Sequence, residues 1–476
     1  MVRKTKMKAP PVAEQIREAA FKDGRIEMVP IDAVKAYERN ARTHDEKQTT
    51  VIMASMREFG FVNPVLVDAD NVIVAGHGRV QAARQLGITH VPVLRIAGLT
   101  PDQLRAYRLA DNRIAELAGW DEDILAIELQ YLVELDEQVP IEVLGWNGAE
   151  IDIKLDASGT EGGDPAAEDI PALEPVAVSR VGDLWLLGRH RLLCGSALLP
   201  ANYDLLLRGE QVDFVCQDPP WNIKINSIVG SGKTQFREFL MGSGEMSDAG
   251  FRQFLYDQLA CNRDRAKPGA ILQVFIDWRG VEKVIAAGLA LGLEHINVCV
   301  WSKGGGMGSP WRSGHELVVV FRNPGGPTKD RVQLGRYGRY RTNVWEVPGQ
   351  NSFGKHRMEA LQMHPTSKPV ALLTEAIRDV TDRGDILLDS FMGSGSLLIA
   401  AEKTGRTARG MELDPLYVDT IVRRWQAFTN ESAILEGLDR TFGEVEAERC
   451  CEKRPPVRQR TRPGIVTPFT EGADDE

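Results

Sequence analysis

The segment Asp218–Trp221 (DPPW) follows an apolar run, Val212–Gln217, and brings together a carboxylate, two prolines and an indole. Prolines at a strand end lack an N–H and fix the backbone, so nearby main-chain carbonyls stay free to accept hydrogen bonds. An amino group has two hydrogens to donate, and the Asp218 carboxylate and the Pro219 carbonyl can each accept one. This pairing would aim the nitrogen lone pair at an electrophilic carbon and stabilise the positive charge that develops on nitrogen.

The indole of Trp221 offers a flat face to a base that has left its stack. The candidate catalytic residues are therefore Asp218, Pro219, Pro220 and Trp221. An ordinary strand-ending turn explains the same four residues, and the tetrapeptide by itself does not decide between the two interpretations.

A second candidate site lies at Asp385–Gly395 (DILLDSFMGSG), where an apolar run ends in Asp389 and a glycine-rich turn precedes a helix. Strand, glycine turn and helix together bring the backbone close to a bound nucleotide. A later apolar stretch ends in Glu412, which could accept both hydroxyls of a ribose. The turn lacks the third glycine of a dinucleotide fingerprint, and its carboxylate suits a cationic ligand better than a pyrophosphate. S-adenosylmethionine (AdoMet), with a sulfonium and an ammonium, fits this pattern, whereas a glycine turn without a ligand is the alternative.

The stretch Val181–Phe428 resembles the amino-methyltransferases of DNA, in the class whose catalytic motif precedes the cofactor motif. The chain departs from the family at Ser390, where proline is usual. Four segments carry the resemblance in the family's order: Asp218–Trp221, His364–Pro369, Asp389–Gly395, and Glu412–Pro415 with Tyr417.

This resemblance implies an AdoMet-dependent enzyme that flips a base out of DNA and transfers the methyl group directly. An aspartate-led tetrapeptide is mostly paired with adenine N6 and a serine-led one with cytosine N4, so Asp218 favours adenine; the family more often has tyrosine in the place of Trp221. Cytosine-N4 methylation and a non-catalytic DNA-binding partition or regulatory protein are the alternatives. The implied cofactor-binding residues are Thr366, Lys368, Asp389, Phe391, Gly393, Gly395, Ser396 and Glu412.

Target recognition in this class usually lies between the two halves, which here is residues 322–363. That segment holds eight Lys and Arg residues against three acids, a charge of +5 in a chain of −10, with aromatic residues interleaved. Phosphates and bases attract this composition, although a solvated loop would also carry it. The expected contacts to double-stranded DNA are Arg331, Arg336, Arg339 and Arg341. His315 could flank the flipped base or belong to the core.

The N-terminal part carries another group of residues that could do chemistry. Glycines open a helix directly after a strand, which is a ready anion site, and an arginine adds positive charge. The stretch from Pro30 to about Arg113 resembles the ParB/sulfiredoxin-like domain, which implies binding of a nucleotide or of the DNA backbone; a scaffold without a ligand is the alternative. The candidate residues are Arg42, His44, Gly76, His77, Gly78 and Arg79.

These motifs need an α/β framework to position them. We expect an AdoMet-dependent methyltransferase Rossmann-like sheet with helices on both faces, preceded by a small α+β ParB/sulfiredoxin-like domain. Strands are expected at 63–67, 71–74, 212–217, 270–275, 295–301, 316–321 and 386–389, and a helix at 78–86. The expected organisation is a tail (1–25), the ParB-like domain (26–155), an acidic linker (156–180), the methyltransferase domain (181–430) and a second tail (431–476).

Composition narrows the remaining choices. No apolar run reaches the roughly 20 residues that a membrane span needs, and the first ten residues lack a secretory signal. The six cysteines form no CxxC pair, so neither a metal site nor a disulfide framework is expected. A cytoplasmic protein is the simplest expectation. The oligomeric state is not fixed by the sequence, and a homodimer is one option.

Overall fold

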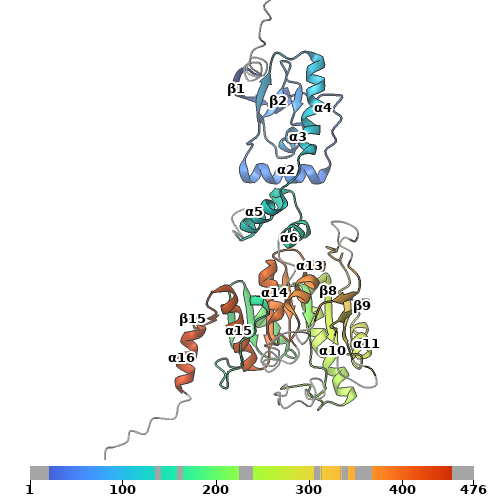
Figure 1. The fold of residues 1–476 in the computed structure, drawn as a ribbon, viewed down its shortest axis with the longest axis vertical. Coiled ribbons are helices and arrows are strands. Elements are labelled where there is room, and N and C mark those ends of the chain that lie inside the picture. The colour runs from blue at the N-terminus through green and yellow to red at the C-terminus, as the bar shows by residue number, and fades with distance from the viewer. Residues whose placement is uncertain are drawn as a thin grey trace, which may run out of the picture. The chain divides into compact units, whose positions relative to one another are not determined.

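The computed structural model describes residues 21–134, 141–157, 165–224, 240–304, 311, 313–332, 334, 341–348 and 367–452. The chain divides into two compact units, Met1–Glu161 and Gly162–Glu476. Each unit has its own sheet, drawn in blue and in green to red in Figure 1. Among the described residues, no helix is long and apolar enough to cross a membrane.

The first unit is built on a four-stranded sheet of order β1-β4-β2-β3. Strand β1 (Phe21–Pro30) pairs antiparallel with β4 (His90–Ile96), β4 pairs parallel with β2 (Val65–Val67), and β2 pairs antiparallel with β3 (Ile73–Ala75). The two expected strands at 63–67 and 71–74 are confirmed in shortened form. The expected tail does not extend to residue 25, because β1 begins at Phe21.

Helices complete this unit and enclose its core. They are η1 (Ile31–Ala33), α2 (Glu46–Phe59), α3 (His77–Gln85), α4 (Pro101–Leu117), α5 (Glu122–Glu134), η2 (Ile141–Leu144) and α6 (Gly148–Ala157). Valines of the central strands and of α3 are buried together, among them Val65, Val80 and Val93. Helix α3 matches the helix expected at 78–86, and α4 begins with a complete capping box formed by Thr100 and Gln103, which satisfies donors at its first turn.

The second unit holds an eleven-stranded sheet of order β11-β9-β10-β8-β7-β12-β13-β6-β5-β14-β15. Its five central strands are parallel: β8 (Ala266–Ile276), β7 (Val212–Gln217), β12 (Ile386–Asp389), β13 (Thr407–Glu412) and β6 (His190–Cys194). The expected strands at 212–217 and 386–389 agree with β7 and β12 residue for residue. Every residue of β7 is buried, as expected for a parallel strand covered on both faces.

Further strands, most of them paired antiparallel, extend this sheet at both edges. Strands β9 (Glu294–Ser302), β10 (His315–Arg322) and β11 (Val344–Glu346) lie on one side, and β5 (Leu184–Leu187), β14 (Ile434–Leu435) and β15 (Arg440–Thr441) on the other. Helices α8 (Pro200–Leu207), α10 (Asp248–Arg265) and α11 (Val281–Ala290) contribute to one hydrophobic layer; α13 (Val370–Val380), α14 (Ser396–Thr404), α15 (Pro415–Thr429) and α16 (Phe442–Glu452) contribute to the other. The expected sheet with helices on both faces is confirmed (Figure 1).

The expected acidic linker is not loose over its whole length. Residues 165–168 form a short helix, α7 (Pro165–Glu168), and the Ala167 carbonyl accepts a hydrogen bond from the buried Arg424 guanidinium at 2.7 Å. The Glu168 carboxylate accepts the Val370 N–H at 2.8 Å and so caps α13. Farther on, the Asp419 carboxylate accepts the N–H groups of Val178 and Ser179. Glu168, one of the acids that suggested a linker, therefore caps a helix.

The expected C-terminal tail also starts too early. Residues 433–452 continue the fold through β14, β15 and α16, and Ala433, Leu435, Phe442 and Val445 are buried. Their apolar side chains are widely spaced among charged residues, so the composition of this segment does not predict that it packs in the core.

Candidate active site

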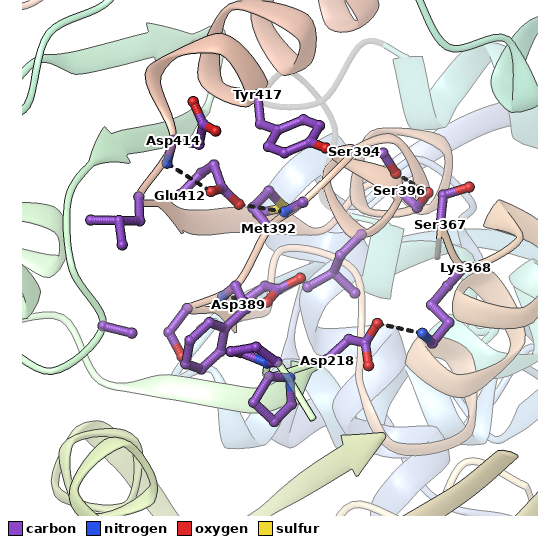
Figure 2. A pocket seen from close by; sticks show the side chains of 18 of the residues that line it. Asp218, Ser367, Lys368, Asp389, Met392, Ser394, Ser396, Glu412, Asp414 and Tyr417 are labelled. Carbon is purple, nitrogen blue, oxygen red and sulfur yellow. Dashed lines mark hydrogen bonds and ion pairs between the residues drawn. The ribbon is translucent and has the colours of Figure 1, made fainter. Parts of the chain in front are cut away.

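Four loops of the second unit meet at one pocket, and all four follow carboxyl ends of the central parallel strands. They come after β6 (Gly195, Ala197), β7 (Asp218–Trp221), β12 (Asp389–Leu397) and β13 (Glu412–Asp414). In open α/β sheets, the crevice beyond the carboxyl ends of the strands is where ligands bind. The catalytic candidate Asp218 and the cofactor candidates Asp389 and Glu412 therefore share one pocket, as Figure 2 shows.

Asp218 forms an ion pair with a buried lysine, Lys368, which was predicted from the sequence to bind the cofactor. The Lys368 ammonium pairs with Asp218 Oδ2 and lies 3.3 Å from Glu316 Oε2, and Lys303 Nζ lies 2.5 Å from Glu316 Oε1. The Trp221 indole donates to Asp218 Oδ1 at 3.2 Å. Cations and carboxylates thus alternate along this row, and Figure 2 shows Lys368 directed at Asp218.

The alternating cations and carboxylates offset the free-energy cost of burying these charges. Burial and the nearby Glu316 raise the pKa of Asp218, and Lys368 opposes that rise. Burial works to raise the pKa of Glu316 as well, but Lys368 and Lys303 lower it overall. A buried carboxylate remains ionised only when such partners compensate for lost hydration. Each carboxylate oxygen has two lone pairs, so Asp218 can still accept a hydrogen bond from a substrate amino group.

The cofactor loop connects β12 to α14 by a tight turn. Gly395 has a φ of +82°, and a Cβ added there would come within 3.0 Å of Ile421, so only glycine fits without a shift of the neighbouring helix. Asp389 Oδ1 accepts the Phe391 N–H at 2.9 Å, and Glu412 Oε2 accepts the Gly393 N–H at 2.9 Å. The turn is therefore fixed to both carboxylates that the sequence selected.

Burial gives these two carboxylates unusual proton affinities, and neither forms an ion pair with a described residue. Burial, together with Asp218 and Glu412, raises the pKa of Asp389 to about 8. Burial raises the pKa of Glu412 to about 7, against the backbone N–H groups that it accepts. Carboxylates with raised pKa values in a cleft are typical of ligand sites. A ligand that brings positive charge and hydroxyl donors would satisfy both of them.

The other predicted cofactor residues lie around this turn, with differences. Phe391, Gly393 and Ser396 line the pocket. The Ser396 hydroxyl also accepts from Arg424 at 3.2 Å. Lys368 lines the pocket too, but its ammonium is engaged by the two carboxylates rather than facing Asp389. Thr366 lies outside the described residues.

Two residues of the site escaped the sequence reading. Asn222, directly after the tetrapeptide, has a φ of +56°, and its side chain bonds to the backbone of Gly244 and Met246. It thereby fixes the loop that places Met241 in the pocket; Asn after a proline pair is a signal for such a turn. The second is Glu316. The sequence pointed to His315 beside it, but in a strand successive side chains alternate, and His315 is exposed.

Two of the four expected DNA contacts, Arg331 and Arg341, take part in ion pairs within the second unit. Arg331 pairs with both oxygens of Asp382 at 2.7 Å, and Arg341 pairs with Asp379 at 2.9 Å. Asp382 precedes β12, so Arg331 lies at the amino end of the parallel strands, about one strand length of roughly 15 Å from the carboxyl edge. Arg331 and Arg341 are thus engaged in ion pairs within the unit. Arg336 and Arg339 lie outside the described residues.

We predict that Arg331→Met lowers the free energy of unfolding by about 1 kcal/mol, the value of a two-point, partly buried ion pair. The KM for DNA should remain within about twofold, because the guanidinium is far from the pocket edge. Chemical denaturation and steady-state kinetics measure the two effects. Asp382→Asn should give the same loss, and the double variant no further loss. Weaker DNA binding with unchanged stability would restore Arg331 as a DNA contact.

The N-terminal candidates gather at the start of α3. Gly76 has a φ of +110° and caps the helix, and a Cβ at Gly78 would lie 3.0 Å from His44 Nδ1. His77 Nε2 accepts the Tyr37 N–H at 3.2 Å, and burial, with His44 and Arg108 nearby, lowers the pKa of His77 to about 4. His77 is therefore neutral at physiological pH.

The two predicted arginines of this group donate hydrogen bonds to other residues of the protein. Arg79 donates to the carbonyls of Asn63 and Pro64 at 2.6 and 2.8 Å, and Arg42 donates to Asn112 Oδ1 at 3.0 Å. The structure thus brings the glycines and histidines together, while Arg79 donates to the chain before β2 and Arg42 donates to helix α4.

Comparison with known proteins agrees with both units. A family model described as DNA methylase matches residues 212–423, and one described as ParB N-terminal domain matches residues 15–113. The ParB-like nuclease domain-containing protein YnaK of Escherichia coli (strain K12) is 45% identical over 74 residues, which cover 16% of this chain and 85% of that protein. The type II methyltransferase M.HpaI of Haemophilus parainfluenzae is 23% identical over 252 residues, 49% of this chain and 74% of that protein.

Solved structures of DNA methyltransferases also resemble part of this chain. The PvuII DNA methyltransferase (cytosine-N4-specific) covers 55% of this chain and 98% of its own, at 15% identity and a TM-score of 0.38. The M1.HpyAVI–SAM complex covers 49% and 97%, at 18% identity and a TM-score of 0.37. The family matches thus show a domain of the N6/N4 DNA methylase family at residues 212–423, preceded by a ParB-like domain at residues 15–113.

Proposed function

We propose that this protein transfers a methyl group from AdoMet to the N6 nitrogen of a flipped adenine in double-stranded DNA. One observation carries the proposal: Asp218 of the tetrapeptide shares a pocket with the Asp389 and Glu412 carboxylates of the cofactor turn. The aspartate at the head of the tetrapeptide favours adenine over cytosine.

The pocket fits the charge and hydrogen-bonding groups of AdoMet. Glu412 would accept the ribose hydroxyls, and Asp389 would face the cationic amino-acid end, which removes the cost that raises their pKa values. Phe391 and the Gly393 backbone line the same space. When bound, AdoMet supplies a methyl group activated by its sulfonium.

The residues of the chain would bind and orient the amino group that accepts this methyl. The Asp218 carboxylate and the Pro219 carbonyl accept its two hydrogens, which directs the lone pair and stabilises the positive charge that develops on nitrogen. Lys368 opposes the rise in the pKa of Asp218 and pairs with one of its oxygens, and the Trp221 indole donates to the other. Pro220 stiffens the loop between them.

The test is nucleoside analysis of DNA incubated with the purified full chain and methyl-labelled AdoMet. We expect labelled N6-methyladenine. Labelled N4-methylcytosine would instead support the alternative that the protein methylates cytosine N4. Folded protein that binds AdoMet but labels no base in DNA of varied sequence would leave the DNA-binding regulatory alternative. Single-molecule sequencing of DNA from an undermethylated host that expresses the protein then gives the recognition site.

For the N-terminal unit we propose an accessory role in binding a nucleotide. The supporting observation is the glycine-initiated start of α3, where Gly78 packs against His44 and leaves no room for a side chain. Equilibrium dialysis of the full chain against labelled nucleoside triphosphates is expected to show binding that Gly78→Val removes. Absence of binding at millimolar nucleotide would assign this unit a scaffold role.

A further inference from the structure

Four buried polar side chains connect the ends of the two strands that carry the candidate site. Gln217 is the last residue of β7, Ser390 follows β12, and Gln258 and Asn262 lie one turn apart on α10. Their exposed fractions are 1, 2, 1 and 0%. We refer to these four residues as the amide cluster.

The cluster is connected through the Gln217 side chain. Its carbonyl Oε1 accepts from Ser390 Oγ at 2.9 Å and from Asn262 Nδ2 at 2.7 Å, and its amide Nε2 donates to Gln258 Oε1 at 2.7 Å. Asn262 Nδ2 also lies 3.2 Å from Ser390 Oγ. Each strand end is thus bonded to the other and to the helix that covers them.

This connection lies where the backbone pairing of the two strands stops. Strands β7 and β12 are paired at Leu387 with Phe214 and at Leu388 with Val215. Two residues farther along, the same register places Ser390 opposite Gln217. Side-chain hydrogen bonds therefore continue the pairing at the point where the ladder has ended and the strands would otherwise be free to separate.

We propose that the amide cluster is a positioning device, which fixes the placement of the catalytic aspartate relative to the cofactor turn. Asp218 directly follows Gln217, and Asp389 directly precedes Ser390. A change in the cluster therefore moves the methyl-accepting side of the pocket relative to the methyl-donating side. Ser390 lines the pocket but is only 2% exposed, and its hydroxyl donates to Gln217, so the cluster acts through the placement of Asp218 and Asp389. This inference rests on the proposed function.

A polar cluster suits this role better than an apolar contact. Hydrogen bonds fix distance and direction, whereas apolar side chains of similar volume can slide with little cost. A buried network in which each member has partners also specifies one arrangement, because any other leaves polar groups unpaired. Transfer of a methyl group requires near-contact and alignment of donor and acceptor, so a displacement of about 1 Å can reduce the rate about a hundredfold.

The test uses Ser390→Ala and Gln217→Met in the full chain, with methyl transfer and AdoMet binding measured side by side. We expect kcat to fall about 10- to 100-fold in both variants, while the Kd for AdoMet changes less than about threefold. The double variant should be no slower than the slower single variant, because both changes break the same connection. Ser390→Ala removes only one hydroxyl and guards against a folding defect in Gln217→Met.

The matched control is Thr404→Val, which removes an equally buried hydroxyl. Thr404 is 0% exposed and donates to the Ala400 carbonyl at 2.7 Å, at the end of α14 remote from the turn. A similar fall in melting temperature with unchanged kcat is expected for this variant. Equal kcat in Ser390→Ala, Gln217→Met and the control would overturn the positioning role. An inactive wild-type protein would instead overturn the proposed function, and the inference with it.

Discussion

Asp218→Ala is expected to reduce kcat for methyl transfer at least about a thousandfold, a loss of about 4 kcal/mol in transition-state stabilisation. The change removes the acceptor that orients the amino group and the negative charge that stabilises developing positive charge on nitrogen. AdoMet binding should stay within about threefold, since the Glu412 and Asp389 side of the pocket is unchanged. Single-turnover transfer and calorimetric titration with AdoMet measure the two quantities.

A control is needed because Asp218→Ala also leaves the Lys368 ammonium with fewer carboxylate partners. Asp218→Asn preserves the shape of the side chain and should lose activity to a similar extent, since a neutral amide stabilises a cation poorly. Asp204→Ala, which removes an exposed carboxylate paired with Arg265, should leave kcat unchanged. If Asp218→Ala or Asp218→Asn loses AdoMet affinity as strongly as it loses transfer, the residue belongs to the cofactor side and the catalytic assignment is wrong.

Asp389→Asn is expected to weaken AdoMet binding about 30-fold or more. The Asp389 carboxylate is buried and accepts a hydrogen bond from the Phe391 N–H. Within the described residues, it has no paired cation. A cationic ligand would provide that charge, and charge-assisted hydrogen bonds of this kind contribute about 2 kcal/mol or more. Titration with the non-reactive product S-adenosylhomocysteine, which lacks the sulfonium but keeps the amino-acid ammonium, should show a similar loss. Unchanged AdoMet affinity in folded Asp389→Asn would remove the residue from the site.

The pH dependence of binding gives an independent check on the same carboxylates. With pKa values raised to about 8 for Asp389 and about 7 for Glu412, both groups hold protons at pH 6 in the empty pocket and lose them by pH 9. Because a cation binds the ionised forms, AdoMet affinity should rise with pH across this window. Asp389→Asn should flatten the upper part of the profile. A wild-type profile that is flat from pH 6 to 9 would contradict the assignment.

The stability of the ligand-free protein should change with pH in the opposite direction to AdoMet affinity. A carboxyl whose pKa is higher in the folded than in the unfolded chain binds protons more tightly when folded, so its favourable contribution is lost as pH rises toward the folded pKa. The ligand-free protein should therefore lose stability between about pH 4 and 8 from these two groups. The rise in melting temperature on adding AdoMet should be larger at pH 8.5 than at pH 6.

Much of the site could be predicted from the sequence because it lies in short segments with strong local constraints. Strand β12 ends in Asp389 and Asp218 directly follows β7, and the expected bounds of both strands agree with the structure residue for residue. Gly395 stands where the turn requires a positive φ. Parallel strands present their carboxyl ends at one edge, so placing Asp218 and Asp389 after two such strands already predicts that they meet.

Pairing between distant side chains was decided by the tertiary structure. Arg331 and Arg341 belong to a basic, aromatic segment, and only the fold shows that Asp382 and Asp379 accept their guanidiniums. Lys368 lies in a motif associated with the cofactor, yet its ammonium meets Asp218 and Glu316. Charge in a sequence is counted per residue, whereas its effect depends on partners within about 4 Å, which composition does not specify.

The fold class, the strands that hold the site and the residues at their ends could be inferred from the sequence, since they follow from local periodicity and turn chemistry, and the family was inferred from the resemblance of four motifs. The fold alone decided which charges are neutralised, how residues 165–180 and 433–452 join the second unit, and how Gln217 and Ser390 connect the two halves of the pocket. Those features depend on contacts between residues far apart in the chain, and their energies come from burial and hydrogen-bond geometry that exist only after packing.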